Sequence, residues 1–321
     1  MKKIAVVCGG YSGESEVSMR SAAMIMNNID RNQYEPIQIV IEKDRWYAMM
    51  DNLELPINKG NFSVDINGVE WRCDGVFMII HGTPGENGIM QGYFEMLGIP
   101  TTTGYTLNMA LTFNKKMTTR VLSTMNYTTA RSISLNQDEQ WTVEQVLEHV
   151  NLPCFVKPNA GGSSIGTSKV NQREELQSAI ERAFHEDKNV LVEEFVRGTE
   201  VTCGVIQWQG RITALPITEI VSQTQFFDYE AKYKGLSDEI TPARISESLT
   251  TKIQGLAESI YRNLQCRGMI RVDFIIQDDV PYVIEVNTTP GFSEASIIPQ
   301  QAAAVGISKT ALISAVIESC F

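Results

Sequence analysis

The sequence lacks several features that would assign it to a class at once. No run of 18 apolar residues is present, so we expect no membrane-spanning helix. There is no surplus of basic residues, because 27 Lys and Arg stand against 38 Asp and Glu, a formal net charge of −11. A net-acidic chain binds a phosphate backbone poorly, which counts against a role in nucleic-acid binding. It does not exclude a small phosphorylated ligand, since a few lysines can reverse the potential within a cleft.

Closely spaced cysteine pairs are also missing. The six cysteines show no Cys-x-x-Cys spacing, so a metal or redox pair of that kind is not expected. Several lie within apolar runs, and we predict free, buried thiols in a reducing cytoplasm. The cysteines are Cys8, Cys73, Cys154, Cys203, Cys266 and Cys320.

The length of 321 residues suggests two or three domains, and 43% hydrophobic with 20% charged residues is ordinary globular composition. We predict three domains, at residues 1–105, 106–188 and 189–321. The first alternates short apolar strands with a helical pattern, which is typical of a parallel sheet in an α/β protein. Its expected strands are residues 4–8, 34–41 and 75–80, and its expected helix is residues 17–29.

The other two domains are predicted to mix helices and strands. In the second we expect helices at residues 108–125 and 173–185, a strand at 154–157, and a Gly/Ser-rich loop at 161–166. In the third we expect strands at residues 190–194, 201–207, 269–276 and 282–287, and a helix from residue 309. The polar stretch 222–240 is long for a loop in a compact domain, which indicates a lid or a disordered segment.

The most informative segment is a predicted β-hairpin formed by residues 271–276 and 282–287. Folded at Asp279, it has one apolar face with the pairs Val272–Val286, Phe274–Ile284 and Ile276–Tyr282. The opposite face has the pairs Asp273–Glu285 and Arg271–Asn287. A slip by one residue would mix the two faces, so the pattern itself favours this register.

Two carboxylates, Asp273 and Glu285, face each other in this register. Directly opposed Cβ atoms lie about 4.5–5.5 Å apart, and like charges at that distance repel. A shared proton, the neighbouring Arg271 or a divalent cation would offset the repulsion. With the amide oxygen of Asn287, the acids form an all-oxygen set that suits Mg²⁺ or Mn²⁺ rather than Zn²⁺. A solvated outer sheet face, with the charges merely exposed, is the alternative.

Lysines near a glycine-rich loop indicate an anion site. Lys157 ends a predicted strand just before residues 161–166, whose small side chains allow main-chain N–H groups to surround an anion. The spacing is not that of a Walker A motif, and a plain flexible loop is the alternative. Lys115 lies within a predicted helix, where a lysine is ordinarily just solvated.

The strand at residues 190–194 runs into acids and a glycine turn. An adenine needs an acceptor for its amino group and a main-chain donor for a ring nitrogen, and ribose hydroxyls suit a carboxylate. The residues here that offer such groups are Glu193, Glu194, Phe195, Val196 and Glu200.

The turn after the first strand, residues 9–14, does not match the G-x-G-x-x-G fingerprint, which disfavours a nicotinamide-dependent dehydrogenase. It opens a predicted helix, whose N-terminus would normally attract an anion. Glu14 and Glu16 already supply negative charge there, which suits a bound cationic amine. Ordinary first-turn acids that complement the helix dipole are the alternative.

Taken together, these segments resemble the D-alanine–D-alanine ligase family of the ATP-grasp superfamily, over nearly the whole chain. The motifs are GGYSGESEVS (9–18), HGTPGENG (81–88) with Gln91-Gly92, VKP (156–158) with GSSIG (162–166), FDYEAKY (227–233), RVD (271–273) and EVNTTPG (285–291). The resemblance implies an α/β protein with a three-domain ATP-grasp architecture. In it, an N-terminal parallel-sheet α/β domain and two α+β domains enclose the nucleotide.

The resemblance also implies an activity: ATP-dependent ligation of two D-alanine molecules through an acyl phosphate, for peptidoglycan precursors. On the nucleotide side, the implied phosphate-neutralising residues are Lys115, Lys157 and Lys232. Two Mg²⁺ or Mn²⁺ ions would be held by Asp273, Glu285 and Asn287. A cytoplasmic homodimer is the implied assembly.

On the amino-acid side, the resemblance implies that Glu14 holds the first ammonium and His81 orients the first carboxylate. Arg271 and the Gly291 N–H would stabilise the tetrahedral oxyanion, and Ser296 and Ile297 would hold the second carboxylate. Residues 222–240 would close as a lid against water, with Tyr233 reaching Ser163 and Glu14.

Some positions depart from the usual family pattern. None of them removes an implied metal ligand or phosphate-binding lysine, so they affect only the expected surroundings of the site and at most some substrate tuning. They are Asn87, Tyr105, Asn114 and Phe292. Two rivals stay open: a ligase that uses D-lactate or D-serine as the second substrate, and a nucleotide-binding regulator that has lost turnover. The Lys232-Tyr233 pair favours D-alanine over D-lactate but leaves D-serine open.

Overall fold

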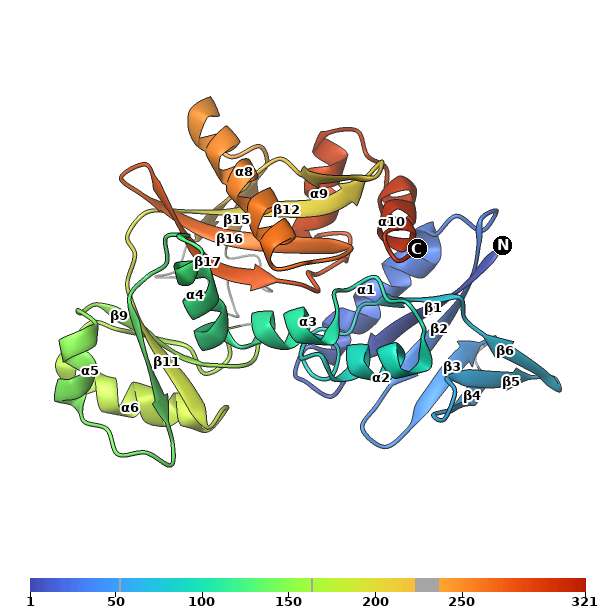
Figure 1. Ribbon diagram of the computed structural model, residues 1–321, viewed down its shortest axis with the longest axis horizontal. Helices are drawn as coiled ribbons and strands as arrows, with labels where there is room; N and C mark the ends of the chain where they lie inside the picture. Colours follow the sequence, from blue (N-terminus) through green and yellow to red (C-terminus); the bar gives the residue numbers. More distant parts are fainter. Residues whose placement is uncertain (52, 163, 223–236) are drawn as a thin grey trace.

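The computed structural model describes residues 1–51, 53–162, 164–222 and 237–321. Three sheets follow one another along the chain and form three neighbouring bodies (Figure 1). Helices α3 (Thr106–Phe113) and α4 (Lys115–Thr124) run between the first and second bodies and also contact strand β17 of the third.

The first sheet is mixed rather than purely parallel. At its centre β1 (Lys2–Gly9) pairs in parallel with β2 (Tyr34–Ile41) and β7 (Gly75–Met78), as the βαβ pattern predicted. Antiparallel strands extend it beyond β2: β3 (Trp46–Met50), β4 (Leu53–Asn58), β5 (Ser63–Ile66) and β6 (Val69–Arg72). The connections between these strands are only a few residues long, which suffices for antiparallel neighbours but not for a parallel crossover. Helices α1 (Ser15–Asn28) and α2 (Ile89–Leu97) follow β1 and β7.

The second sheet is antiparallel, in the order β10-β9-β11-β8. Its strands are β8 (Ser132–Asn136), β9 (Cys154–Pro158), β10 (Ser168–Val170) and β11 (Asn189–Glu194). Helices α5 (Val143–His149) and α6 (Arg173–Phe184) bury Val146, Leu176 and Ile180 against it. Because β11 pairs with both β8 and β9, the domain boundary expected between residues 188 and 189 falls inside this sheet.

The third sheet runs β15-β14-β12-β16-β17, with β13 added on β12. Its strands are β12 (Thr199–Trp208), β13 (Arg211–Ala214), β14 (Thr218–Ser222), β15 (Ser237–Ile240), β16 (Met269–Gln277) and β17 (Val280–Asn287). Helices α8 (Glu247–Asn263), α9 (Ile297–Ala304) and α10 (Lys309–Glu318) complete this body (Figure 1).

The single helix expected at residues 108–125 is two helices that meet at Asn114. Asn114 is extended (φ −91°, ψ 99°), and its side chain accepts a hydrogen bond from the Met117 N–H. An asparagine that caps the second helix in this way explains the break. Lys115 is therefore the first residue of α4, at a helix N-terminus rather than on a solvated helix side.

The β16–β17 hairpin has the predicted register only near its acids. Asp273 pairs with Glu285 and Arg271 with Asn287, but a β-bulge then shifts Phe274 onto Val283. The expected pairs Phe274–Ile284 and Ile276–Tyr282 are therefore wrong. The cause is a two-residue turn: Asp278 and Asp279 both have positive φ (49° and 60°), a conformation typical of tight hairpins, and the bulge at Ile284 takes up the extra residue.

All six cysteines are free, and all but the partly exposed Cys73 are buried, as predicted. Burial raises the pKa of Cys8 and of Cys266 to about 12, so these thiols are not reactive nucleophiles. In the described part of the chain, no helix is both long enough and apolar enough to cross a bilayer.

Candidate active site

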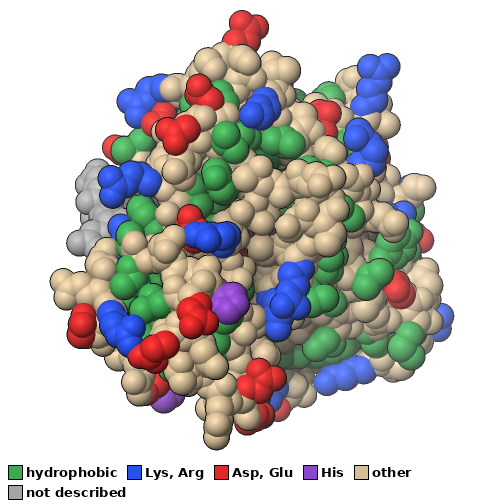
Figure 2. All heavy atoms as spheres, turned by 60° about the vertical axis from the view of Figure 1, so that its left-hand side comes forward, with side chains coloured by type: hydrophobic (Ala, Val, Ile, Leu, Met, Phe, Trp, Pro, Cys, Tyr) green, Lys and Arg blue, Asp and Glu red, His purple; other side chains and the backbone are tan. Residues whose placement is uncertain are grey.

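Two cavities meet in the groove between the three bodies. The larger, about 810 Å³, lies between α1, the loop after β7 and the segment joining β17 to α9. The smaller, about 160 Å³, lies between the second sheet and the β16–β17 hairpin. Lys115, Gly161, Gly162 and Glu285 line both, so the cavities are continuous at these residues. On the face that Figure 2 shows, acidic and basic side chains are interspersed.

The opposed acids are balanced by two cations. Arg271 donates from Nε and Nη2 to the two oxygens of Asp273, both at 2.8 Å. Lys115 Nζ lies 3.3 Å from Glu285 Oε1. Burial opposes the charge on Arg271, but its carboxylate neighbours outweigh this and raise the pKa of the guanidinium above its ordinary value. The acids therefore face the cavity rather than bulk solvent, with Asp273 only 17% exposed and Glu285 34%.

The donor set at this point is all oxygen. Asp273 and Glu285 are cross-strand partners, and Asn287 is the next residue outward on the same strand face. Within the described residues no group of three His, Cys, Asp or Glu side chains gathers, so the site offers two acids and one amide. Such a set fits Mg²⁺ or Mn²⁺, which keep further positions for water or phosphate oxygens, and does not suit Zn²⁺.

Thr202 on β12 is a supporting residue that the sequence did not reveal. It is 2% exposed, and its Oγ1 donates to Asp273 Oδ1 at 2.5 Å. The contact depends on the pairing of β12 with β16, which places Thr202 opposite Asp273 across 71 residues of sequence. No local motif carries that information.

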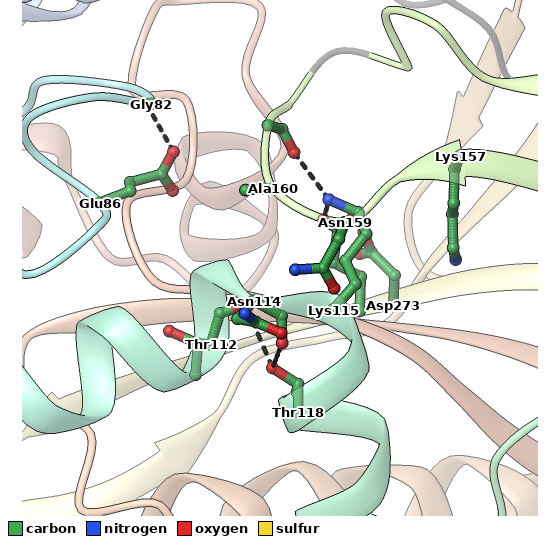
Figure 3. A network of polar contacts seen from close by, with 12 residues as sticks. Gly82, Glu86, Thr112, Asn114, Lys115, Thr118, Lys157, Asn159, Ala160 and Asp273 are labelled. Carbon is green, nitrogen blue, oxygen red and sulfur yellow. Dashed lines mark hydrogen bonds and ion pairs between the residues drawn. The ribbon is translucent and has the colours of Figure 1, made fainter. Parts of the chain in front are cut away.

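Lys115 and Lys157 line the smaller cavity together with the two acids, and Figure 3 shows both lysines with Asp273. Lys115 Nζ donates to the Gly161 carbonyl at 2.7 Å, so α4 holds the glycine-rich loop close to Glu285. Lys157, on β9, lies 2.5 Å from Glu193 on β11, and both side chains are nearly buried. Two of the three predicted lysines, Lys115 and Lys157, thus line the smaller cavity.

The smaller cavity has apolar walls on both sides. Phe155 and Val196 contribute from the second body, and Ile275 and Ile284 from the hairpin. Ile275 lies on the same face of β16 as Asp273, as the alternation of side chains along a strand predicts. Ile284 lies on that face of the hairpin only because of the bulge in β17. A cavity with apolar walls that is also lined by acids and lysines is suited to a planar base with phosphates attached.

The segment after β11 lies along the same cavity. Glu193, Glu194, Val196 and Glu200 line it, as predicted. Phe195 is not among the lining residues: its ring packs against Phe155 with centroids 5.8 Å apart, under the ammonium of Lys169. Any contact of Phe195 with a ligand would therefore come from its main chain.

Glu14 lies at the N-terminus of α1, against two glycines from other elements. A Cβ atom added to Gly162 would meet Glu14 Oε2 at 2.6 Å, and one added to Gly82 would meet it at 3.2 Å. Only residues without side chains permit this approach of the first and second bodies. Glu14 lines the larger cavity together with Gly162.

In the loop after β7, His81 is buried and Glu86 is half-buried. Burial lowers the pKa of His81. Burial, with Glu14 as a second cause, raises the pKa of Glu86 to about 8, and this carboxyl accepts the Gly82 N–H at 2.6 Å. His81 Nδ1 lies 2.8 Å from the Thr289 carbonyl and Nε2 3.2 Å from Ser21 Oγ. Both ring nitrogens have protein partners, and His81 also lines the larger cavity. The expected contact of His81 with a substrate carboxylate stays a prediction.

The far end of the larger cavity contains Gly291, Ser296 and Ile297, as the resemblance implied. Ser296 caps α9, whose free main-chain N–H groups favour a carboxylate. Glu239 on β15 also lines this end and was not predicted; burial raises its pKa, and it accepts a hydrogen bond from Gln300 Nε2 at 3.0 Å. Finding Glu239 required the position of β15, which no motif indicates.

Three predicted site residues lie outside the described residues: Ser163, Lys232 and Tyr233. Most of the expected lid, residues 222–240, lies there as well. At its ends, Ser222 of β14 pairs with Ser237 of β15.

The fold and the groove define a class. An antiparallel sheet faces an acid-bearing hairpin, lysines lie on both of these elements' sides of the groove, and a separate N-terminal α/β body closes it. This arrangement is that of an ATP-grasp ligase. Two family models match the chain: "D-ala D-ala ligase N-terminus" over residues 3–104 and "D-ala D-ala ligase C-terminus" over residues 117–318. The chain belongs to the D-alanine–D-alanine ligase family.

Individual relatives agree with this assignment. The chain is 47% identical over 319 residues to the D-alanine–D-alanine ligase of Flavobacterium johnsoniae, with 99% of each chain covered. It is 46% identical over 322 residues to that of Porphyromonas gingivalis, covering 99% of this chain and 98% of the relative. The family, the enzyme class and the fold predicted from the motifs are confirmed.

Solved structures give the same fold. The VanG D-Ala:D-Ser ligase from Enterococcus faecalis matches with a TM-score of 0.88 and 32% identity, covering 100% of this chain and 99% of that one. The D-alanine–D-alanine ligase from Bacillus anthracis complexed with ATP matches with a TM-score of 0.81 and 28% identity, covering 100% of this chain and 97% of that one.

Proposed function

We propose that this enzyme joins two D-alanine molecules, with ATP as the energy source, to make the dipeptide used in peptidoglycan precursors. The observation that carries the proposal is the acid pair Asp273–Glu285, opposed across the hairpin where the two cavities meet. The smaller cavity is suited to a nucleotide and the larger to two small zwitterions. Their junction is therefore where a phosphoryl group would pass from one ligand to the other.

On the nucleotide side, the adenine would lie between Phe155 and the hairpin isoleucines. Its amino group and ring would meet the segment of Glu193, Glu194, Phe195 and Val196, and its ribose would meet Glu200. The phosphates would extend toward Lys157, Lys115 and Lys232. Asp273, Glu285 and Asn287 would hold two Mg²⁺ or Mn²⁺ ions, which when bound would neutralise charge on the transferring phosphoryl group.

On the amino-acid side, Glu14 would hold the ammonium of the first D-alanine, which leaves its carboxylate pointing toward the nucleotide. A carboxylate oxygen attacks the γ-phosphorus and ADP leaves, giving an acyl phosphate. The second D-alanine, held by its carboxylate at Ser296 and Ile297, must first lose a proton from its ammonium group, and the resulting amine then attacks the acyl carbon. Arg271 and the Gly291 N–H would stabilise the tetrahedral oxyanion before phosphate leaves. Tyr233 and Ser163 complete the site in this proposal.

Three further expectations belong to the proposal. The chain would divide into an N-terminal domain of residues 1–105, a middle domain and a C-terminal domain; the pairing of β11 favours a second boundary after residue 194. The enzyme would act in the cytoplasm, which supplies ATP and is reducing enough to keep its cysteines as free thiols. It would form a homodimer.

Product analysis tests the substrate assignment. Purified enzyme with ATP, Mg²⁺ and D-alanine should release phosphate and form D-alanyl-D-alanine, and L-alanine should give neither. Likeness to a D-Ala:D-Ser ligase makes D-serine the acceptor to compare directly. A dominant mixed product in an equimolar mixture of D-alanine and D-serine would replace this proposal with that activity. Nucleotide binding with no D-alanine-dependent phosphate release would favour a regulator.

A further inference from the structure

A continuous chain of hydrogen bonds joins α1, the loop after β7 and the turn after β17. The Phe292 N–H donates to Ser21 Oγ at 3.2 Å, and Ser21 Oγ lies 3.2 Å from His81 Nε2. His81 Nδ1 lies 2.8 Å from the Thr289 carbonyl oxygen. The Thr289 N–H donates to Asn287 Oδ1 at 3.2 Å. Ser21, His81, Thr289 and Phe292 are buried, so water is not readily available to replace these partners.

The directions of these bonds are fixed by chemistry. A carbonyl oxygen can only accept, so His81 Nδ1 must carry a proton. Ser21 Oγ accepts from the Phe292 N–H, and its own hydroxyl proton is free to point at Nε2. A neutral imidazole with Nδ1–H has a bare, accepting Nε2, which completes the chain without an unpaired donor. Burial disfavours the doubly protonated ring, while the nearby Glu14 and Arg271 act on it in opposite directions.

The segment held in this way carries proposed site residues at both ends. Asn287 lies two residues before Thr289 and Gly291 two residues after it. Thr289 is held at its carbonyl by His81 and at its N–H by the side chain of Asn287. A displacement of this peptide would shift the Asn287 side chain and the Gly291 N–H together. The N-terminal body thereby fixes the geometry of the turn that the C-terminal body presents to the substrates.

We propose that His81 is a positioning residue locked by Ser21 in the neutral Nδ1–H tautomer, which acts through the Thr289 peptide rather than by binding a substrate carboxylate. Its effect on catalysis rests on the proposed function. The tautomer itself is a property of the folded enzyme without ligands.

The tautomer is measured directly by ¹⁵N nuclear magnetic resonance of the full enzyme. The chain has three histidines, His81, His149 and His185, so the His81 signals are identified by their absence in a His81→Asn variant. We expect a proton coupled to Nδ1 and a bare Nε2. A proton on Nε2 alone, or a ring exchanging between tautomers, overturns the inference. This result does not depend on turnover, so an enzyme inactive with D-alanine would refute the proposed function and leave the tautomer test standing.

Kinetics of two replacements test the positioning role. The Asn side chain can place an N–H near the Nδ1 position, whereas Gln places its amide near Nε2. We expect His81→Gln to lower kcat about 10- to 100-fold, with a smaller change in KM for the first D-alanine, and His81→Asn to recover part of kcat. A rise in that KM with kcat unchanged, or equal losses in both variants, would overturn the role. The exposed His149 serves as the matched control, since His149→Gln should behave as the parent enzyme.

Discussion

Replacement of Thr202 by valine tests how the Asp273 carboxylate is held. Valine has nearly the shape of threonine but lacks the hydroxyl that donates to Asp273 Oδ1 at 2.5 Å. Arg271 would remain as the other partner of that carboxylate, with both of its bonds at 2.8 Å. Asp273 should therefore stay ionised but gain rotational freedom about its side chain.

The magnitude follows from the type of bond. A hydrogen bond to a charged group contributes about 1.5–3 kcal/mol, and Thr202 is too buried for water to replace it fully. If that loss falls on the positioning of the acid in the transition state, turnover should drop about 10- to 100-fold. The apparent affinity for Mg²⁺ should fall with it, while KM for D-alanine should stay close to the parent value, because the larger cavity is untouched.

The assay is phosphate release at saturating ATP and D-alanine over a range of Mg²⁺ concentrations. Thr202→Ser, which keeps the hydroxyl, should retain most of the activity. Thr213→Val is the matched control, since this threonine bonds only to the Arg211 carbonyl at the exposed end of the sheet. A Thr202→Val enzyme with parental kcat and parental Mg²⁺ dependence would refute the reasoning.

Three further outcomes are expected. Gly162→Ala should raise KM for D-alanine more than KM for ATP, because the added Cβ would press on Glu14; an unchanged KM for D-alanine would contradict this. Glu193→Gln should raise KM for ATP by loosening Lys157, with isothermal titration of a non-hydrolysable ATP analogue as the check. Glu86 has a folded pKa near 8, above its ordinary value of 4.5, so it favours folding at low pH and loses this advantage as pH rises through 8. Between pH 4.5 and about pH 8, the Tm of Glu86→Gln should therefore rise relative to that of the parent enzyme. Tm profiles of the two enzymes that run parallel over this range would contradict the prediction.

The sequence predicted most of what local patterns can encode. The βαβ core, the acid pair and the lysines near glycine turns all follow from strand alternation and short motifs. The acid pairing was predicted correctly because a one-residue slip at Asp273 would have mixed apolar and charged faces.

Other features depended on contacts between distant segments or on backbone detail. The bulge at Ile284 follows from the tight turn at Asp278-Asp279, whose length the apolar pattern did not reveal. Thr202 depends on the pairing of β12 with β16. The protein partners of His81 lie 60 and 208 residues away from it. The break at Asn114 has a local signal in the sequence, because asparagine is a favoured helix cap.

Turnover of Asp273→Asn and Glu285→Gln tests the central claim most directly. Each change removes one negative charge from the opposed pair while keeping the side-chain shape, so the circular dichroism spectrum and Tm should stay near those of the parent. We predict that D-alanine-dependent phosphate release is abolished in both variants at every Mg²⁺ or Mn²⁺ concentration. Near-parental rates in either folded variant would contradict the assignment of this hairpin as the site of phosphoryl transfer.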